Sequence, residues 1–359
     1  MNSIHEVHIN SYTPLELLNL YYSDGQCEGN KGNKLWQKMN SLLSWHNLLN
    51  HNYQSDLCPL LFYVITKALP KLNSRILQQD RTFDEWVPDP ILAQLQKYYQ
   101  NSLKRNIILL EELKQIIQEL KKQGIQLVIL KGAFLAENVY KNIACRPMSD
   151  LDILIRNADR EKCYEILLNI GYRRIPESQQ TETLHYKFFK DFLGKTVIIE
   201  IHHRLVKEKF QTNFNLEEIL FWGYLPIEDH LVHLSWHAIR HGIIRLLWLC
   251  DIAQIIKNNK NSINWEVVSQ KSISSNTKKQ YILVVHLTTT LLMPSFWNNR
   301  ASLITYPIHR ISEVLFLSIQ KKVKNLEDPR TLRYLLNMCL MRQKDLKKPI
   351  QQYIHYRLM

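Results

Sequence analysis

The spacing of hydrophobic residues changes twice along this 359-residue chain, and that change limits the folds that the chain can adopt. Up to Gly124 the apolar residues recur every three or four positions, as they do from Leu92 to Leu120, which predicts helices. Between Ile125 and Leu205, short runs rich in β-branched residues alternate with helical stretches. Helical spacing returns from Asn213 onward. We therefore expect an α+β fold in which a small mixed sheet is flanked by N- and C-terminal helical regions.

This pattern divides the chain into an N-terminal helical region over residues 1–90, a core with a lead-in helix over residues 91–212, and a C-terminal helical region over residues 213–359. The Pro-containing stretch Asp84–Pro90 marks the first boundary. The spacing predicts helical structure from Leu15 to about Lys71, and further helices over Asp229–His241, Ile243–Lys257, Trp265–Gln270, Thr277–Leu292 and Ile308–Val323.

Strands and helices alternate within the core. Ile125–Gly132 predicts a short strand that ends in a Lys-Gly turn, and the residues after it have helical spacing. Leu151–Ile155 predicts a second strand, which is again followed by a helix. His185–Phe189 and Thr196–Leu205 are both strand-like, and the short turn at residues 193–195 joins them into a predicted hairpin.

The charge of the chain favours a partner that carries phosphate. A formal net charge of +13 attracts anions such as nucleotides or nucleic acids. Basic residues are densest from Lys321 to Arg357, a pattern that is equally typical of a binding surface and of a solvated helical face.

Cysteine usage and hydropathy favour a cytoplasmic protein that does not associate with a membrane. The six cysteines are widely spaced and form no C-x-x-C pair, so neither a zinc site nor a disulfide framework is expected. The first residues lack a basic segment followed by an apolar run, and no stretch of about 18 apolar residues occurs.

Three acidic residues on the predicted strands are the candidates for chemistry. Asp150 and Asp152 are two positions apart, so they share a face with α-carbons roughly 6.5–7 Å apart. Glu200 is the charged residue of an otherwise apolar strand, on the same face as His202. Close carboxylates repel unless a cation lies between them, and Mg²⁺ prefers oxygen ligands. The alternative is that the aspartates merely end a strand and that Glu200 lies at a solvated edge.

Residues near these acids are suited to holding phosphates. Lys131 and Gly132 follow a strand and precede a helix, where backbone N–H groups, the helix N-terminus and the lysine charge all attract an anion. Arg146, in the loop before the acids, is expected to make a second phosphate contact. Ser149 can form a local hydrogen bond in the same loop.

The runs LVILKGAFLAENVY, RPMSDLDILI, HYKFF and IIEIHHRL, within Leu127–Leu205, resemble the bacterial nucleotidyltransferase-like family of the DNA polymerase β superfamily. That resemblance implies a polymerase β-type core in which Asp150, Asp152 and Glu200 are catalytic and bind two Mg²⁺ ions. It also implies that Lys131 and Gly132 form the phosphate-side turn and that NTPs, ATP among them, are substrates. The superfamily's usual turn is Gly-Ser, whereas this chain has Lys-Gly.

The histidines have several interpretations. His202 resembles the family's histidine after the third acid. Its role is either in the active site, where it would orient Glu200 or touch the nucleotide, or purely structural. His185 has the same alternatives. His233, His237 and His241 recur every four positions and so share one helix face. They could be core residues, a wall of the substrate cleft or metal ligands.

Two functions are therefore open. The first is a Mg²⁺-dependent transferase that moves a nucleoside monophosphate from an NTP to RNA, to a peptide or protein, or to a small molecule. The alternative is a catalytically degenerate module that binds a nucleotide or RNA, which the Lys-Gly turn and the basic charge favour. The sequence does not identify the acceptor.

Overall fold

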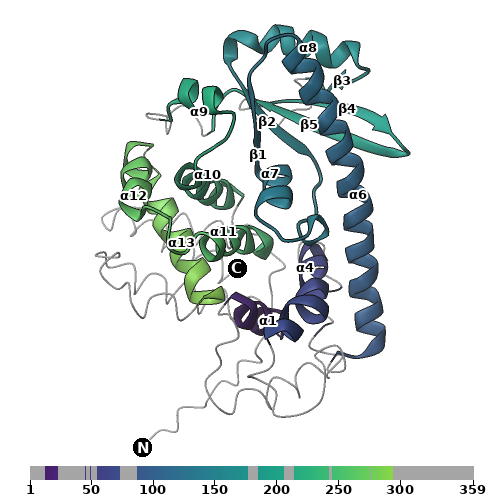
Figure 1. Ribbon diagram of the computed structural model, residues 1–359, viewed down its shortest axis with the longest axis vertical. Coiled ribbons are helices and arrows are strands. Elements are labelled where there is room, and N and C mark those ends of the chain that lie inside the picture. The colour runs from purple at the N-terminus through teal and green to yellow at the C-terminus, as the bar shows by residue number, and fades with distance from the viewer. Residues whose placement is uncertain are drawn as a thin grey trace, which may run out of the picture.

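A computed structural model describes residues 13–22, 45, 49, 55–72, 87–176, 185–205, 214–241, 245–275 and 277–293. Figure 1 shows a sheet at one end of the molecule, helix α6 (Asp89–Lys122) running along its side, and a group of helices at the other end. The chain is thus a mixed α+β protein, as the sequence predicts. The boundaries at residues 90 and 212 stay predictions.

The described N-terminal elements are helical. They are α1 (Thr13–Tyr22), a 3-10 turn at Ser55–Leu57, α4 (Cys58–Tyr63), a π-helical turn at Val64–Ala68 and α5 (Leu69–Leu72). Helix α6 begins after Pro88 and has 34 residues. Gly124, with a φ of 73°, follows its end, because glycine adopts the left-handed conformation at little cost.

Five strands form one mixed sheet in the order β1-β2-β5-β4-β3. The core elements are β1 (Leu127–Leu130), α7 (Lys131–Asn138), a 3-10 turn at Ile143–Cys145, β2 (Leu151–Ile155), a second 3-10 turn at Asn157–Asp159, α8 (Arg160–Asn169), β3 (Arg173–Arg174), β4 (His185–Phe192) and β5 (Lys195–His202). Strand β2 runs parallel to β5, and the other neighbouring strands pair antiparallel.

The predicted hairpin is confirmed, with a tighter turn than expected. Strands β4 and β5 are joined by Leu193 and Gly194 alone, because Lys195 already belongs to β5. The φ angles of these two residues are 49° and 69°, as a two-residue hairpin turn of type I′ requires. The short edge strand β3 was not predicted.

The C-terminal elements described are α9 (Leu216–Trp222), α10 (Ile227–Arg240), α11 (Leu246–Asn258), α12 (Trp265–Ser274) and α13 (Lys278–Leu292). Four of them correspond, within a few residues at each end, to the four helices predicted between Asp229 and Leu292. The predicted helix Ile308–Val323 and the basic segment Lys321–Arg357 lie outside the described residues.

The two faces of the sheet differ in chemistry. One face, which includes Ile153 and Ile201, is buried against α6 and α8 in a hydrophobic cluster. The opposite face carries Leu154 together with Asp152, Glu200 and His202, and it is turned toward the C-terminal helices. The predicted alternation along both strands is therefore correct, and it places the polar residues between sheet and helices.

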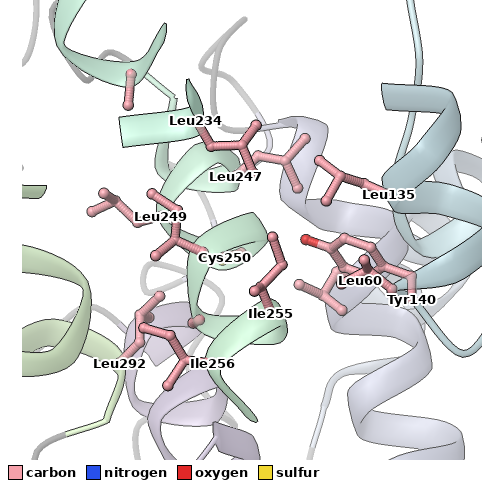
Figure 2. Packing of buried hydrophobic residues seen from close by; sticks show 14 of the residues in the cluster. Leu60, Leu135, Tyr140, Leu234, Leu247, Leu249, Cys250, Ile255, Ile256 and Leu292 are labelled. Carbon is pink, nitrogen blue, oxygen red and sulfur yellow. The ribbon is translucent and has the colours of Figure 1, made fainter. Parts of the chain in front are cut away.

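A second hydrophobic cluster joins the core to both helical regions (Figure 2). Its members include Leu135 of α7, Tyr140 after that helix, Leu60 of α4 and Ile255 of α11, all labelled in Figure 2. Burying one such aliphatic side chain contributes about 1.5–3 kcal/mol. The packing therefore fixes α10 and α11 against the polar face of the sheet.

The sequence predicts neither a disulfide framework nor a membrane-spanning segment, and two structural findings bear on these expectations. Cys58, Cys145, Cys163 and Cys250 are free and buried. Among the described helices, none is both long enough and apolar enough to cross a membrane.

Candidate active site

A pocket of about 400 Å³ lies where the polar face of the sheet meets α10 and α11. Its volume is within the range of small-molecule sites. The pocket is lined by seven of the eight predicted site residues: Lys131, Gly132, Arg146, Ser149, Asp150, Asp152 and Glu200. His202, the eighth, contacts Asp152 directly. Residues scattered over some 70 positions of the sequence therefore converge on one site.

Asp152, Glu200 and His202 form a compact buried cluster. Asp152 and Glu200 are register partners on the parallel strands β2 and β5, so their side chains leave the same face of the sheet. His202 lies two residues beyond Glu200, with Nε2 at 2.7 Å from Oδ1 of Asp152 and 3.6 Å from Oε2 of Glu200. One ligand atom from each residue lies within 4.8 Å of the other two, which is a spacing that can hold a metal ion.

Two lysines compensate the charge of these acids. The Lys131 ammonium donates to Oδ1 of Asp152 at 2.5 Å and lies 4.0 Å from Oε2 of Glu200. Lys187 of β4 lies 2.5 Å from Oε1 of Glu200. Burial raises the pKa of Asp152, but Lys131 and His202 outweigh it and hold that pKa well below its usual value. Asp152 is thus charged, and both acids are paired with a lysine.

Asp150 lies at the edge of this cluster, one residue before β2. It is half-buried, and the Ser149 hydroxyl donates to its Oδ1 at 3.1 Å. Burial, followed by the charges of Asp152 and Glu200, raises the pKa of Asp150 to about 6. The two predicted aspartates therefore line the same pocket but differ in exposure: Asp152 is buried on the strand, whereas Asp150, before the strand, is only half-buried.

The Lys-Gly turn has an unusual backbone. Lys131 has a φ of 43°, a left-handed conformation that is costly for a residue with a side chain and is enriched at functional sites. Gly132 leaves room beside it, because an added Cβ would lie 3.3 Å from Cγ of Met148 and 3.7 Å from Nη1 of Arg146. The turn thus directs the lysine toward the acids while the start of α7 faces the pocket.

Arg146 makes contacts that sequence reasoning did not foresee. Its Nε donates to both carboxylate oxygens of Asp251 on α11, at 2.9 and 3.2 Å, and Nη2 donates to Oδ2 at 3.0 Å. Tyr140 donates to the same carboxylate at 2.9 Å. Arg146 therefore lines the pocket and also bridges the core loop to the C-terminal helices. Its contact with phosphate stays a prediction.

The helical side of the pocket carries rings and arginines. The rings of His237 and His241 have their centroids 4.6 Å apart, and the Trp248 ring lies 5.2 and 5.5 Å from them. Burial and then Lys131 hold the pKa of His237 well below its usual value; burial and then Arg240 lower the pKa of His241 to about 4. Both imidazoles are therefore neutral at pH 7. Of the alternatives for these two histidines, the structure favours a wall of the cleft.

His233 and His185 are placed differently. His233 is buried, and its Nδ1 lies 2.8 Å from the carbonyl oxygen of Leu205, so it belongs to the packing behind the pocket. His185 pairs with His202 in the β4–β5 register, but its side chain lies outside the part of the chain that is described.

Sequence reasoning missed Lys187, Asp251, Arg240, Arg245 and Trp248 as lining residues. Only Lys187 had a usable signal, because it lies on the predicted strand HYKFF and so had to point to one face of the sheet. The others depend on how α10 and α11 pack.

Taken together, the sheet, the buried acids and the cationic turn define an α+β protein with an acidic pocket beside a cationic turn. Residues 41–293 match the model of a family described as "Uncharacterised nucleotidyltransferase". Because the match covers well over half of the chain, this protein belongs to that nucleotidyltransferase family. No curated protein and no solved structure matches the chain.

Proposed function

We propose that this protein is a Mg²⁺-dependent nucleotidyltransferase with a polymerase β-type core, which moves a nucleoside monophosphate from an NTP to an acceptor and releases pyrophosphate. The observation that carries this proposal is the convergence of Asp150, Asp152 and Glu200 beside the Lys131–Gly132 turn in one pocket. Membership of a nucleotidyltransferase family supports it independently.

The donor set fits a divalent cation. Asp152 and Glu200 offer carboxylate oxygens on a buried, preorganised face, and Asp150 adds a third carboxylate at the rim. Oxygen ligands of this kind suit Mg²⁺, which usually binds through one or two carboxylates together with substrate phosphates. Two bound Mg²⁺ ions would neutralise the triphosphate and polarise the bond that breaks.

The protein residues have separate roles in this proposal. Asp150 and Asp152 would hold the metal ion that binds the nucleotide's phosphates. Glu200 would hold the second ion or take the proton of the attacking hydroxyl, phosphate or amine group. His202, in contact with Asp152, keeps that carboxylate oriented.

The phosphates need cationic and N–H partners. Lys131, the N–H groups at Gly132, Arg146 and Ser149 line the part of the pocket next to the acids, and we assign them to the triphosphate. Lys131, which donates to Asp152 in this structure, would donate to a phosphate when the nucleotide binds.

The acceptor is RNA, a peptide or protein, or a small molecule. We place the reaction in the cytoplasm, because buried free thiols are typical of a reducing compartment.

Pyrophosphate release tests the proposed activity. Purified protein is incubated with Mg²⁺, each NTP and a cell extract freed of small nucleotides, and pyrophosphate is quantified. We expect release with at least one NTP, and a loss of 100-fold or more in Asp150→Asn and Asp152→Asn. Glu161→Gln, on the exposed surface of α8, is the matched control and keeps full activity. Full activity in either aspartate variant would overturn the assignment.

One observation favours the alternative of a nucleotide- or RNA-binding module without turnover. Lys131 and Lys187 already neutralise two of the three acids, as they would in a site that no longer needs a metal. Saturable NTP binding that is independent of Mg²⁺, with no pyrophosphate release, would establish this alternative.

A further inference from the structure

The segment Ile143–Ser149, which leads into Asp150, is held by side chains. After a single 3-10 turn at Ile143–Cys145 it belongs to no strand, so its backbone carbonyls need other donors. Six of its seven carbonyls accept a hydrogen bond from a side chain. The conformation of this segment is thus set by the residues around it.

Helix α6 supplies most of these donors. The Ser102 hydroxyl donates to the carbonyl of Ala144 at 2.8 Å. The Asn106 amide, which is buried, donates to the carbonyls of Ile143 and Arg146 at 2.6 and 2.8 Å and accepts from the Met148 N–H at 3.2 Å. A polar residue on the apolar face of this helix is therefore explained by the loop that it holds.

Arg105 contacts both the loop before β2 and strand β5. Its Nε donates to the carbonyl of Met148 at 3.1 Å, and its Nη2 donates to the carbonyl of Ser149 at 2.9 Å and to that of Thr196 at 3.3 Å. Ser149 directly precedes Asp150, and Thr196 is the second residue of β5, the strand that carries Glu200. One guanidinium thus ties the approach to β2 to the beginning of β5.

Asp150 needs such a restraint because its position is not fixed by the sheet. It precedes β2 and is repelled by the carboxylates of Asp152 and Glu200. Among the described residues, the only side-chain hydrogen bond to its carboxylate comes from Ser149, its neighbour in the same loop. This repulsion disfavours a position of Asp150 close to the other two acids, and the hydrogen bonds from Arg105 hold the loop in that position.

We propose that Arg105 is a positioning residue, which fixes the loop before Asp150 relative to β5 so that Asp150 completes the metal-binding set with Asp152 and Glu200. The inference rests on the proposed function, and Arg105 acts through backbone carbonyls without lining the pocket. Only the planar fork of arginine offers Nε and Nη2 donors at this spacing, because a lysine ammonium is a single point on a flexible stem.

Mn²⁺ binding to the full chain, measured by electron paramagnetic resonance without nucleotide, tests this role. We expect Arg105→Ala to weaken Mn²⁺ binding about tenfold, and Arg105→Lys to restore it only in part. Lys104→Ala removes a neighbouring charge from the exposed side of α6 and leaves binding unchanged. The melting temperature of each variant, recorded without metal, verifies that the chain is folded.

A double-mutant cycle separates positioning from a general structural effect. Because Arg105 acts through Asp150, Arg105→Ala in an Asp150→Asn background is expected to cause no further loss of Mn²⁺ affinity. Additive losses, or an Arg105→Ala variant that binds Mn²⁺ like Lys104→Ala, would overturn the proposal. A wild-type chain that binds no Mn²⁺ would overturn the metal site and the positioning role together. Coupling in the cycle upholds the positioning role even where no pyrophosphate is released, so the positioning role and the transfer activity can fail separately.

Discussion

Replacing Lys131 with methionine separates two opposite effects of its ammonium group. The group lies 2.5 Å from a carboxylate oxygen of Asp152 and 4.0 Å from one of Glu200, and its side chain is 12% exposed. Removing one partner of a buried pair costs about 3–5 kcal/mol, because the remaining charge stays buried. For a chain of 359 residues the melting temperature then falls by roughly 4–7 °C in the absence of metal.

The same substitution is expected to strengthen metal binding. An ammonium about 4 Å from a divalent ion repels it by several kcal/mol at an effective dielectric near 20. Loss of Lys131 also changes the summed charge of Asp150, Asp152, Glu200 and the two lysines from −1 to −2. We therefore expect Mn²⁺ to bind at least tenfold more tightly, and to raise the melting temperature of the variant more than that of the wild type.

Differential scanning fluorimetry in EDTA and over a Mn²⁺ series measures both effects. Lys271→Met is the matched control, because Lys271 lies 2.8 Å from buried Asp229 at a site with no predicted metal ligand. This control loses stability without recovering it in Mn²⁺. If Lys131→Met gains no more from Mn²⁺ than the wild type does, the ammonium does not compete with the metal and the reasoning fails.

Three further predictions concern stability. His230 is buried with no partner for either ring nitrogen among the described residues, and burial lowers its pKa to about 3. Because the folded state holds His230 neutral, its contribution to the free energy of unfolding is fully present above pH 6.5 and is lost as the pH falls toward 3. The loss reaches about 2 kcal/mol by pH 5, so His230→Phe is expected to reduce the acid sensitivity of unfolding in urea. Arg146→Met and Asp251→Leu are each expected to cost about 3–5 kcal/mol, and the double variant less than their sum; additive costs in urea would contradict the pairing. Leu193→Asn stabilises the hairpin by about 0.5 kcal/mol, because asparagine tolerates the observed positive φ better; a lower melting temperature would contradict this.

The sheet and its acids were predictable because strand periodicity is local. Residues two apart on a strand share a face, so the positions of Asp152, Glu200 and His202 follow from short runs of sequence. The Lys-Gly turn was equally visible, since a strand ends and a helix begins there. These features depend on the nearest few residues alone.

The contacts of the same residues were not predictable, because they depend on packing between distant elements. Arg146 binds Asp251, more than 100 positions away, and this pair exists only because α11 packs beside the core loop. Periodicity likewise places Asn106 on the apolar face of α6 but does not reveal the carbonyls that it meets. Side-chain partners of this kind follow from tertiary structure.

Mass analysis of acceptors tests the central claim most directly. Total RNA, protein and metabolites are incubated with Mg²⁺, the four NTPs and either wild-type protein or Asp152→Asn, and each fraction is searched for the mass of an added nucleoside monophosphate. We predict that one class of acceptor gains this mass with the wild type and not with Asp152→Asn, together with an equal amount of pyrophosphate. No gain in any fraction, or an equal gain with the variant, would contradict a transferase built on Asp152.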